Sequence, residues 1–214
     1  MPKLPFIFAL LLFFSACSTE KSTSNTEETV AKDTTETKPQ AAPEDNFQTA
    51  FSTYFEALQN SDTAAFNQFI HPKYGLWVIE QPGAVPKMTQ VHDIRNFGRE
   101  YQGKSFFTIA LEIKQCNLVE EPFPSFDCAD LNYDAGKTGY SKDGCFVWDA
   151  EKFKTSGYWN YASLSEAKIQ QIIETLPLVQ KTVLHTNTSF EFHFGKVDDQ
   201  WYLLFAKIMY PCSA

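Results

Sequence analysis

The chain has 214 residues, of which 43% are hydrophobic and 15% aromatic, and its formal net charge is −8 at pH 7. This length and apolar content suit one folded domain with its own core. Arg95 and Arg99 are the only arginines. The acidic balance leaves no cationic surface to neutralise phosphates, so nucleic acid is not expected as a partner.

The N-terminal residues have the order of a bacterial signal peptide. Lys3 precedes an apolar run of about 11 residues, from 4 to 14. Because a helix that spans a bilayer needs about 20 apolar residues, this run is too short for a lasting span. Residues 1–16 therefore predict a signal peptide that is removed from the mature protein.

Small residues and a cysteine follow the apolar run, in the order Phe14-Ser15-Ala16-Cys17. This order resembles the lipobox of bacterial lipoproteins, although Phe14 stands where that family usually has Leu. The resemblance implies that the thiol of Cys17 is acylated and that the acyl chains anchor the protein to a membrane. Ser18, rather than Asp, follows the cysteine, which by resemblance to enterobacterial sorting implies the outer membrane of the cell envelope. The alternative is a secreted protein cut near Ala16, with Cys17 unmodified.

After the predicted lipidation site the chain is rich in Ser, Thr, Glu, Lys and Pro. Such a segment cannot bury enough apolar surface to offset the entropy lost on ordering it. We therefore predict a lipidated cysteine and a disordered tether over residues 17–45, and a single folded domain over residues 46–214.

Four cysteines lie in the predicted domain: Cys116, Cys128, Cys145 and Cys212. An even number of cysteines in an oxidising compartment favours two disulfides. Three pairings are possible. We prefer Cys128 with Cys145, because they flank one polar loop, which leaves Cys116 with Cys212. A zinc site with four cysteine ligands is the alternative, although no C-x-x-C pair is present.

Two helices are predicted at the start of the domain. Pro43-Glu44-Asp45 suits a first helical turn, and apolar residues recur after it at helical spacing. These apolar residues are Phe47, Ala50, Phe51, Tyr54, Phe55 and Leu58. Ser61 or Asp62 can cap a second, shorter helix, which ends at His71-Pro72.

The rest of the domain is predicted to be mostly strands, from its β-branched and aromatic residues, with two further helices. The strands are expected over residues 74–79, 105–119, 179–185, 189–194 and 201–210, and the helices over residues 91–97 and 164–176. The segment 195–199 joins the last two strands as a hairpin.

Amphipathic helices followed by a mostly antiparallel sheet define an α+β fold class. This element order, over about residues 46–214, resembles the NTF2-like superfamily. The resemblance implies a cone in which a curved sheet wraps the first helix and leaves a pocket at its open end. The helix predicted over residues 164–176 departs from that family, which normally runs from strand to strand there. A cystatin-like sandwich is the alternative fold.

The strand predicted over residues 189–194 carries a candidate catalytic pair. Its period of two places three phenylalanines on one face, and Glu191 and His193 on the other. If the polar face lines the cone, Glu191 can orient His193 as a general base, an arrangement similar to the Asp and His of some NTF2-like enzymes. The alternative is that this face is simply the solvated outside of the sheet.

A polar segment offers a candidate metal site. Asp130, Asn132 and Asp134 space three oxygen ligands as a calcium loop does. Ala135 and Ser141 replace the Gly and the Glu that an EF-hand loop needs. The alternative is a polar loop without a metal.

Four aromatic residues are candidates for ligand binding: Trp148, Tyr158, Trp159 and Tyr161. Their rings can stack on sugars or peptides, because they bury apolar area while a polar edge stays in water. The alternative is that they cover a core.

These features favour a non-enzymatic, membrane-anchored envelope lipoprotein of unknown specific role, whose domain binds a small molecule, a glycan or a protein. No cofactor is predicted, because nucleotide-binding and metal-ligand motifs are absent. One alternative is a pocket enzyme that uses Glu191 and His193. The other is a structural component of an envelope assembly.

Overall fold

The computed structural model describes residues 47–99 and 103–212, so the predicted signal peptide, Cys17 and the tether lie outside the described residues. The two helices predicted at the start of the domain are confirmed. α1 spans Phe47–Gln59 and α2 spans Thr63–Asn67. The side chain of Asp62 caps α2 by accepting a hydrogen bond from the backbone N–H of Ala65.

Within the described residues, seven strands form one strongly curled sheet, a half-barrel with the order β2-β1-β9-β8-β7-β6-β3. The pairs β1–β9 and β3–β6 are parallel, and the other neighbouring pairs are antiparallel. The mixed α+β class with a mostly antiparallel sheet is therefore confirmed. The strands are β1 (Leu76–Glu80), β2 (Lys87–Val91), β3 (Leu118–Glu120), β6 (Cys145–Trp148), β7 (Val179–His185), β8 (Phe190–Val197) and β9 (Gln200–Lys207).

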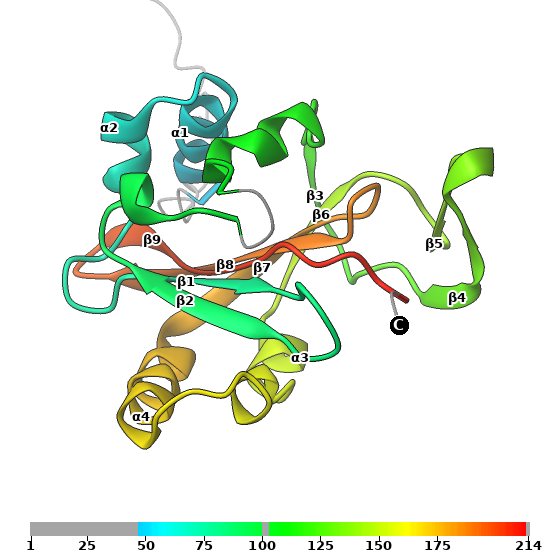
Figure 1. Ribbon diagram of the computed structural model, residues 1–214. Helices are drawn as coiled ribbons and strands as arrows, with labels where there is room; N and C mark the ends of the chain where they lie inside the picture. Colours follow the sequence, from blue (N-terminus) through cyan, green and yellow to red (C-terminus); the bar gives the residue numbers. More distant parts are fainter. Residues whose placement is uncertain (1–46, 100–102, 213–214) are drawn as a thin grey trace, which may run out of the picture. The chain divides into compact units, whose positions relative to one another are not determined.

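Helices cover both faces of this sheet, with α1 and α2 on one side and α3 and α4 on the other (Figure 1). On the first side, α1, α2 and the 3-10 helix η2 (Phe106–Leu111) pack in one core with Phe192 and Phe194 of β8. Trp77 and Phe205 belong to a second core on the other side. Four helical elements surround that core: α3 (Glu151–Lys154), η4 (Tyr158–Asn160), α4 (Glu166–Thr175) and η5 (Leu176–Leu178).

The second helical layer has a direct consequence for the strand that carries Glu191 and His193. The alternation predicted along this strand is confirmed: Phe194 packs on α1, 5.4 Å from the ring of Phe47, whereas His193 stacks on Phe153 of α3. The face that carries His193 is therefore covered by protein, and the expectation of a solvated outer face is wrong.

A separate two-stranded ribbon lies beside the sheet and extends away from it (Figure 1). It consists of β4 (Phe126–Asn132) and β5 (Lys137–Tyr140), with the short helix η3 (Tyr133–Ala135) between them. The segment between the strands predicted at 105–119 and 179–185 thus contains two strands, β4 and β5, that the sequence patterns did not predict.

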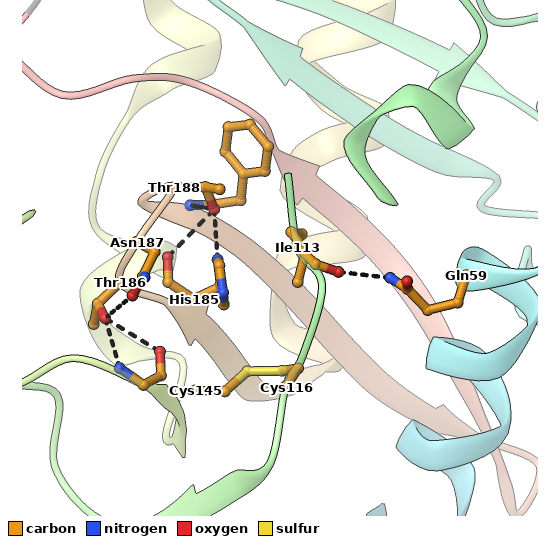
Figure 2. Close-up of a disulfide and its surroundings, with 10 residues drawn as sticks. Gln59, Ile113, Cys116, Cys145, His185, Thr186, Asn187 and Thr188 are labelled. Atoms are coloured by element: carbon orange, nitrogen blue, oxygen red, sulfur yellow. Dashed lines mark hydrogen bonds between the residues drawn. A yellow bond between two sulfur atoms is a disulfide. The ribbon is translucent and has the colours of Figure 1, made fainter. Parts of the chain in front are cut away.

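The four cysteines of the domain do form two disulfides, but the preferred pairing is wrong. Cys116 pairs with Cys145 (Figure 2), and Cys128 pairs with Cys212. The cause lies in the sheet, because the parallel register of β3 with β6 places Leu118 opposite Cys145 and so brings Cys116 beside it. Short separation along the chain was therefore a poor guide to which thiols meet.

The long strand predicted over residues 105–119 is wrong except at its end, where β3 begins. Ser105 instead caps η2 by accepting a backbone N–H. The buried side chains of Phe106, Ile109 and Ile113 recur every three or four residues, which is a helical spacing. Their β-branched and aromatic side chains favour a strand by intrinsic propensity, but their helical spacing decides the structure.

Two smaller boundaries also differ from expectation. The helix predicted over residues 91–97 is reduced to η1 (Ile94–Asn96), because Val91 still belongs to β2. The last hairpin turns tightly at Asp198 and Asp199, whose φ angles are 49° and 61°. Positive φ at both turn residues matches the twist of the flanking strands, so β8 continues to Val197, beyond its predicted end, and β9 begins at Gln200. β9 ends at Lys207, three residues before its predicted end.

Candidate functional site

A pocket of about 590 Å³ lies on the sheet face that carries α3. Residues of β7, β8 and β9 form its floor. The segment from α3 to η4 lines one side, and the β4–β5 ribbon lines another together with the C-terminal residues 210–212. The volume falls in the range of about 300–1,000 Å³ that is typical of small-molecule sites. Because the pocket lies on the face opposite α1, it is not the cone interior that the NTF2-like resemblance implied.

An ion pair occupies the pocket floor. Glu191 of β8 and Lys207 of β9 are directly opposite each other, and Glu191 Oε1 accepts a hydrogen bond of 2.6 Å from Lys207 Nζ. Their side chains are 22% and 16% exposed. The ammonium of Lys207 also lies 5.5 Å from the ring centroid of Tyr158. Both charges are therefore partly removed from water but still reach the pocket.

The surroundings keep both members of this pair ionised. Burial alone raises the pKa of Glu191, but nearby positive charge, first that of Lys207, outweighs burial and holds the pKa below its ordinary value. Burial likewise opposes the charged form of Lys207, yet Glu191 and Tyr158 raise the pKa of Lys207 above its ordinary value. Near neutral pH the floor thus presents a carboxylate and an ammonium side by side.

His193 is next to this pair but does not line the pocket. It is fully buried, with its ring stacked on Phe153 at 3.6 Å between centroids. Nδ1 lies 2.9 Å from Thr182 Oγ1, and Nε2 lies 3.7 Å from Glu191 Oε2, with no hydrogen-bond partner among the described residues. Burial, opposed by the charge of Glu191, lowers the pKa of His193 to about 3. The imidazole is therefore neutral at physiological pH and a weak base.

Aromatic rings make up much of the pocket wall. Phe126 and Tyr140 come from the ribbon, with 4.7 Å between their ring centroids. Phe153 and Tyr158 come from α3 and η4. Burial raises the pKa of Tyr140, so its phenol keeps its proton near neutral pH. Aromatic faces and a charged floor thus meet in one cavity.

Of the four aromatic residues predicted as ligand contacts, Tyr158 alone is among the described residues that line this pocket. Trp159 is 8% exposed and belongs to the second core. Trp148 and Tyr161 are exposed, and neither lines the pocket. The structure therefore separates these residues, which the sequence places close together.

The predicted metal ligands Asp130, Asn132 and Asp134 lie on the exposed ribbon. Asn132 Oδ1 accepts a hydrogen bond from the backbone N–H of Ala135 and so caps η3. In the described part of the chain, no group of three or more His, Cys, Asp or Glu side chains is arranged to hold a metal ion. Asn132 therefore acts as the N-cap of η3, and its side-chain oxygen accepts a backbone hydrogen bond.

Sequence reasoning missed Lys207, Tyr140 and Thr182 as site residues. A signal for Lys207 exists, since a basic residue on one strand of a hairpin often faces an acidic residue on the other. A β-bulge between His193 and Phe194 hides this signal, because it shifts the register of β8 and β9 by one residue. Tyr140 and Thr182 reach the pocket from other strands, and no local pattern marks them.

Comparison with protein-family models, curated proteins and solved structures finds no match for this chain. Among the helices of the described residues, none is both long and apolar enough to cross a bilayer.

Proposed function

We propose that this protein is a lipid-anchored envelope protein whose domain binds a small molecule in the pocket above Glu191 and Lys207. The domain is then an NTF2-like cone whose outer sheet face carries a second helical layer and the binding site. The lipobox-like sequence that ends at Cys17 supports the anchor, and the pocket supports the binding role.

The observation that carries the binding role is the composition of the pocket floor. Glu191 and Lys207 retain enough exposure to meet a ligand, at 22% and 16%, while their pairing offsets much of the cost of placing charge in a cavity. Side chains that are ionised, held in place and flanked by aromatic rings are typical of a small-molecule site.

The alternative of a pocket enzyme is less favoured. A general base must reach the proton that it removes, and its pKa should lie near the working pH. The pKa of His193 is about 3, and its ring is fully buried beneath Phe153. We assign His193 a positioning role, in which it packs against Phe153 and beside Glu191, two residues that line the pocket.

A thermal-shift screen of the full chain with a small-molecule library tests the binding role. The variant Ser156→Trp places a large side chain at an exposed position of the pocket lining. Compounds that bind in the pocket should raise the melting temperature of the wild type by several degrees at saturating concentration. They should have no effect on Ser156→Trp.

Ser141→Trp is the matched control, because Ser141 is also exposed but does not line the pocket. It should respond to compounds as the wild type does. If no compound stabilises the wild type, or if Ser156→Trp responds as strongly as Ser141→Trp, the proposed binding site is wrong.

A further inference from the structure

The charges that line the pocket cancel within the described residues. Its lining includes two acidic side chains, Asp149 and Glu191, and two basic side chains, Lys152 and Lys207. A ligand with one net charge therefore meets no net attraction, since the pocket lining carries equal numbers of favourable and unfavourable charges. This balance favours a ligand without net charge.

The central pair also has little to gain from a charged ligand. Glu191 and Lys207 already contact each other at 2.6 Å, and drawing one of them towards a ligand would leave the other partly buried without its partner. While the pair stays intact, Glu191 offers further acceptor positions and Lys207 offers donors. A hydroxyl group both donates and accepts, so it can bind either member without breaking the pair.

The pocket walls add a requirement on shape. Tyr158 of η4 and Phe126 and Tyr140 of the ribbon line the pocket, and Phe153 adds a smaller surface because it is 3% exposed. Aromatic rings pack well against the C–H groups on the face of a saturated ring. A wholly apolar ligand is disfavoured, because it would strip water from Glu191 and Lys207 and replace none of the lost hydrogen bonds.

From these observations we infer that the pocket takes a neutral saccharide, whose ring faces contact the aromatic walls while its hydroxyl groups bind the Glu191–Lys207 pair. This inference rests on the proposed binding function and names the class of ligand. A hexose ring without a charged substituent satisfies the charge balance, the hydrogen-bonding floor and the aromatic walls together.

Calorimetry and saturation-transfer NMR on the full chain test this inference with defined probes. The neutral probes are maltose, cellobiose, lactose and N,N′-diacetylchitobiose, and the charged probes are glucuronate and glucosamine. At least one neutral disaccharide should bind the wild type more tightly than either charged sugar. Tyr158→Ala should weaken that binding by about tenfold or more. Tyr161→Ala should leave it unchanged, since Tyr161 is 68% exposed and outside the pocket.

Two charge variants sharpen the test. Glu191→Gln leaves the pocket with net positive charge, so neutral-sugar binding should fall by about tenfold while glucuronate binding increases. Lys207→Met leaves net negative charge and should increase the binding of glucosamine instead. Circular dichroism establishes whether each variant folds. If either variant does not fold, the Tyr158 and Tyr161 variants decide the inference.

The outcomes separate this inference from the function on which it rests. Tighter binding of glucuronate or glucosamine than of any neutral disaccharide by the wild type overturns the saccharide inference and leaves the binding pocket standing. The same holds if no sugar binds but the library yields pocket ligands that Ser156→Trp abolishes. If neither sugars nor library compounds bind, both the inference and the proposed function fail.

Discussion

The ionisable side chains of β8 illustrate how neighbours only two residues apart acquire different properties. Glu191 faces Lys207 and remains charged, whereas His193 lies under Phe153 and is neutral. Thr182 supplies a hydroxyl at Nδ1 of His193, which satisfies one ring nitrogen. An uncharged imidazole and a charged carboxylate therefore lie next to each other on the same face of β8.

This burial predicts a specific loss of stability in acid. The pKa of His193 is about 3 in the folded chain and about 6.5 in an unfolded chain. Between these values the unfolded chain binds the extra proton, so stability is lost as the pH falls below about 6.5, by up to about 1.4 kcal/mol per pH unit. Glu191 acts in the same direction at lower pH, because its pKa is also lowered on folding.

Urea unfolding of the wild type and of His193→Gln between pH 7 and pH 5 measures this effect. Between pH 6 and pH 5 the free energy of unfolding should fall by about 1 kcal/mol less in the variant than in the wild type. His71 and His185, whose pKa values are also lowered by burial, are present in both proteins and cancel in the comparison. Equal slopes for the two proteins would contradict the assignment of a buried, neutral His193.

At the scale of elements, α1, α2, α4 and the last three strands follow the sequence patterns closely. Their signals are local: apolar residues at helical or alternating spacing, and caps such as Asp62. The region from 105 to 148 resisted prediction, because its cysteine pairing and the short strands β3 and β6 depend on contacts with distant segments. Gln59 at the end of α1, for example, donates to the carbonyl of Ile113 across 54 residues of chain (Figure 2).

Gly195 of β8 sets how closely η5 approaches the sheet. An added Cβ would lie 2.4 Å from the carbonyl oxygen of Leu178 and 2.6 Å from Cδ1 of Leu204. Gly195→Ala should therefore lower the free energy of unfolding by about 1–3 kcal/mol through overpacking. Gly83→Ala is the control, since nothing lies within 4 Å of the added atom, and it should change stability by less than about 0.5 kcal/mol. Similar losses in both variants under urea unfolding would refute this packing argument.

The disulfide between Cys128 and Cys212 should control the β4–β5 ribbon. The ribbon is a separate two-stranded sheet, and this bond ties it to the C-terminal segment that lines the pocket. Replacing both cysteines with serine should lower the free energy of unfolding by up to about 4.5 kcal/mol in the chain-entropy model. It should also speed trypsin cleavage at Lys137 and Lys142, which limited proteolysis with mass spectrometry would detect.

Replacing Cys116 and Cys145 with serine provides the contrast. Cys145 is 2% exposed and lies in the first core, so this variant should lower the melting temperature of the whole domain without selective cleavage of the ribbon. If both double variants lose the ribbon and the core together, the ribbon is not an independently tethered element.

At the scale of the whole molecule, the proposed membrane anchor and the proposed binding pocket lie in different parts of the chain and can be tested separately. The described residues account for the pocket, and Cys17 lies outside them. The anchor therefore depends on the lipobox-like sequence, whereas the binding role depends on the folded domain.

Substitution of Cys17 tests the anchor. Wild-type protein expressed in a diderm bacterial host should fractionate with membranes, because two or three acyl chains bind a bilayer strongly. Cys17→Ser should be recovered mainly in soluble fractions, as immunoblots of fractionated cells would show. The control variant, with serine at both Cys116 and Cys145, should fractionate with membranes as the wild type does. Membrane association that persists in Cys17→Ser would argue against lipid attachment.

The sequence alone determined the fold class and most helices and strands near the two ends of the domain, because helical and strand periodicities arise between residues that are close in the chain. Only the tertiary structure decided the functional geometry. A β-bulge places Lys207 opposite Glu191, a second helical layer buries His193, and distant cysteines close the pocket wall. These features depend on strand register and on contacts between segments that are far apart in the chain. The residues within one segment do not determine such contacts, so a local sequence pattern cannot predict them.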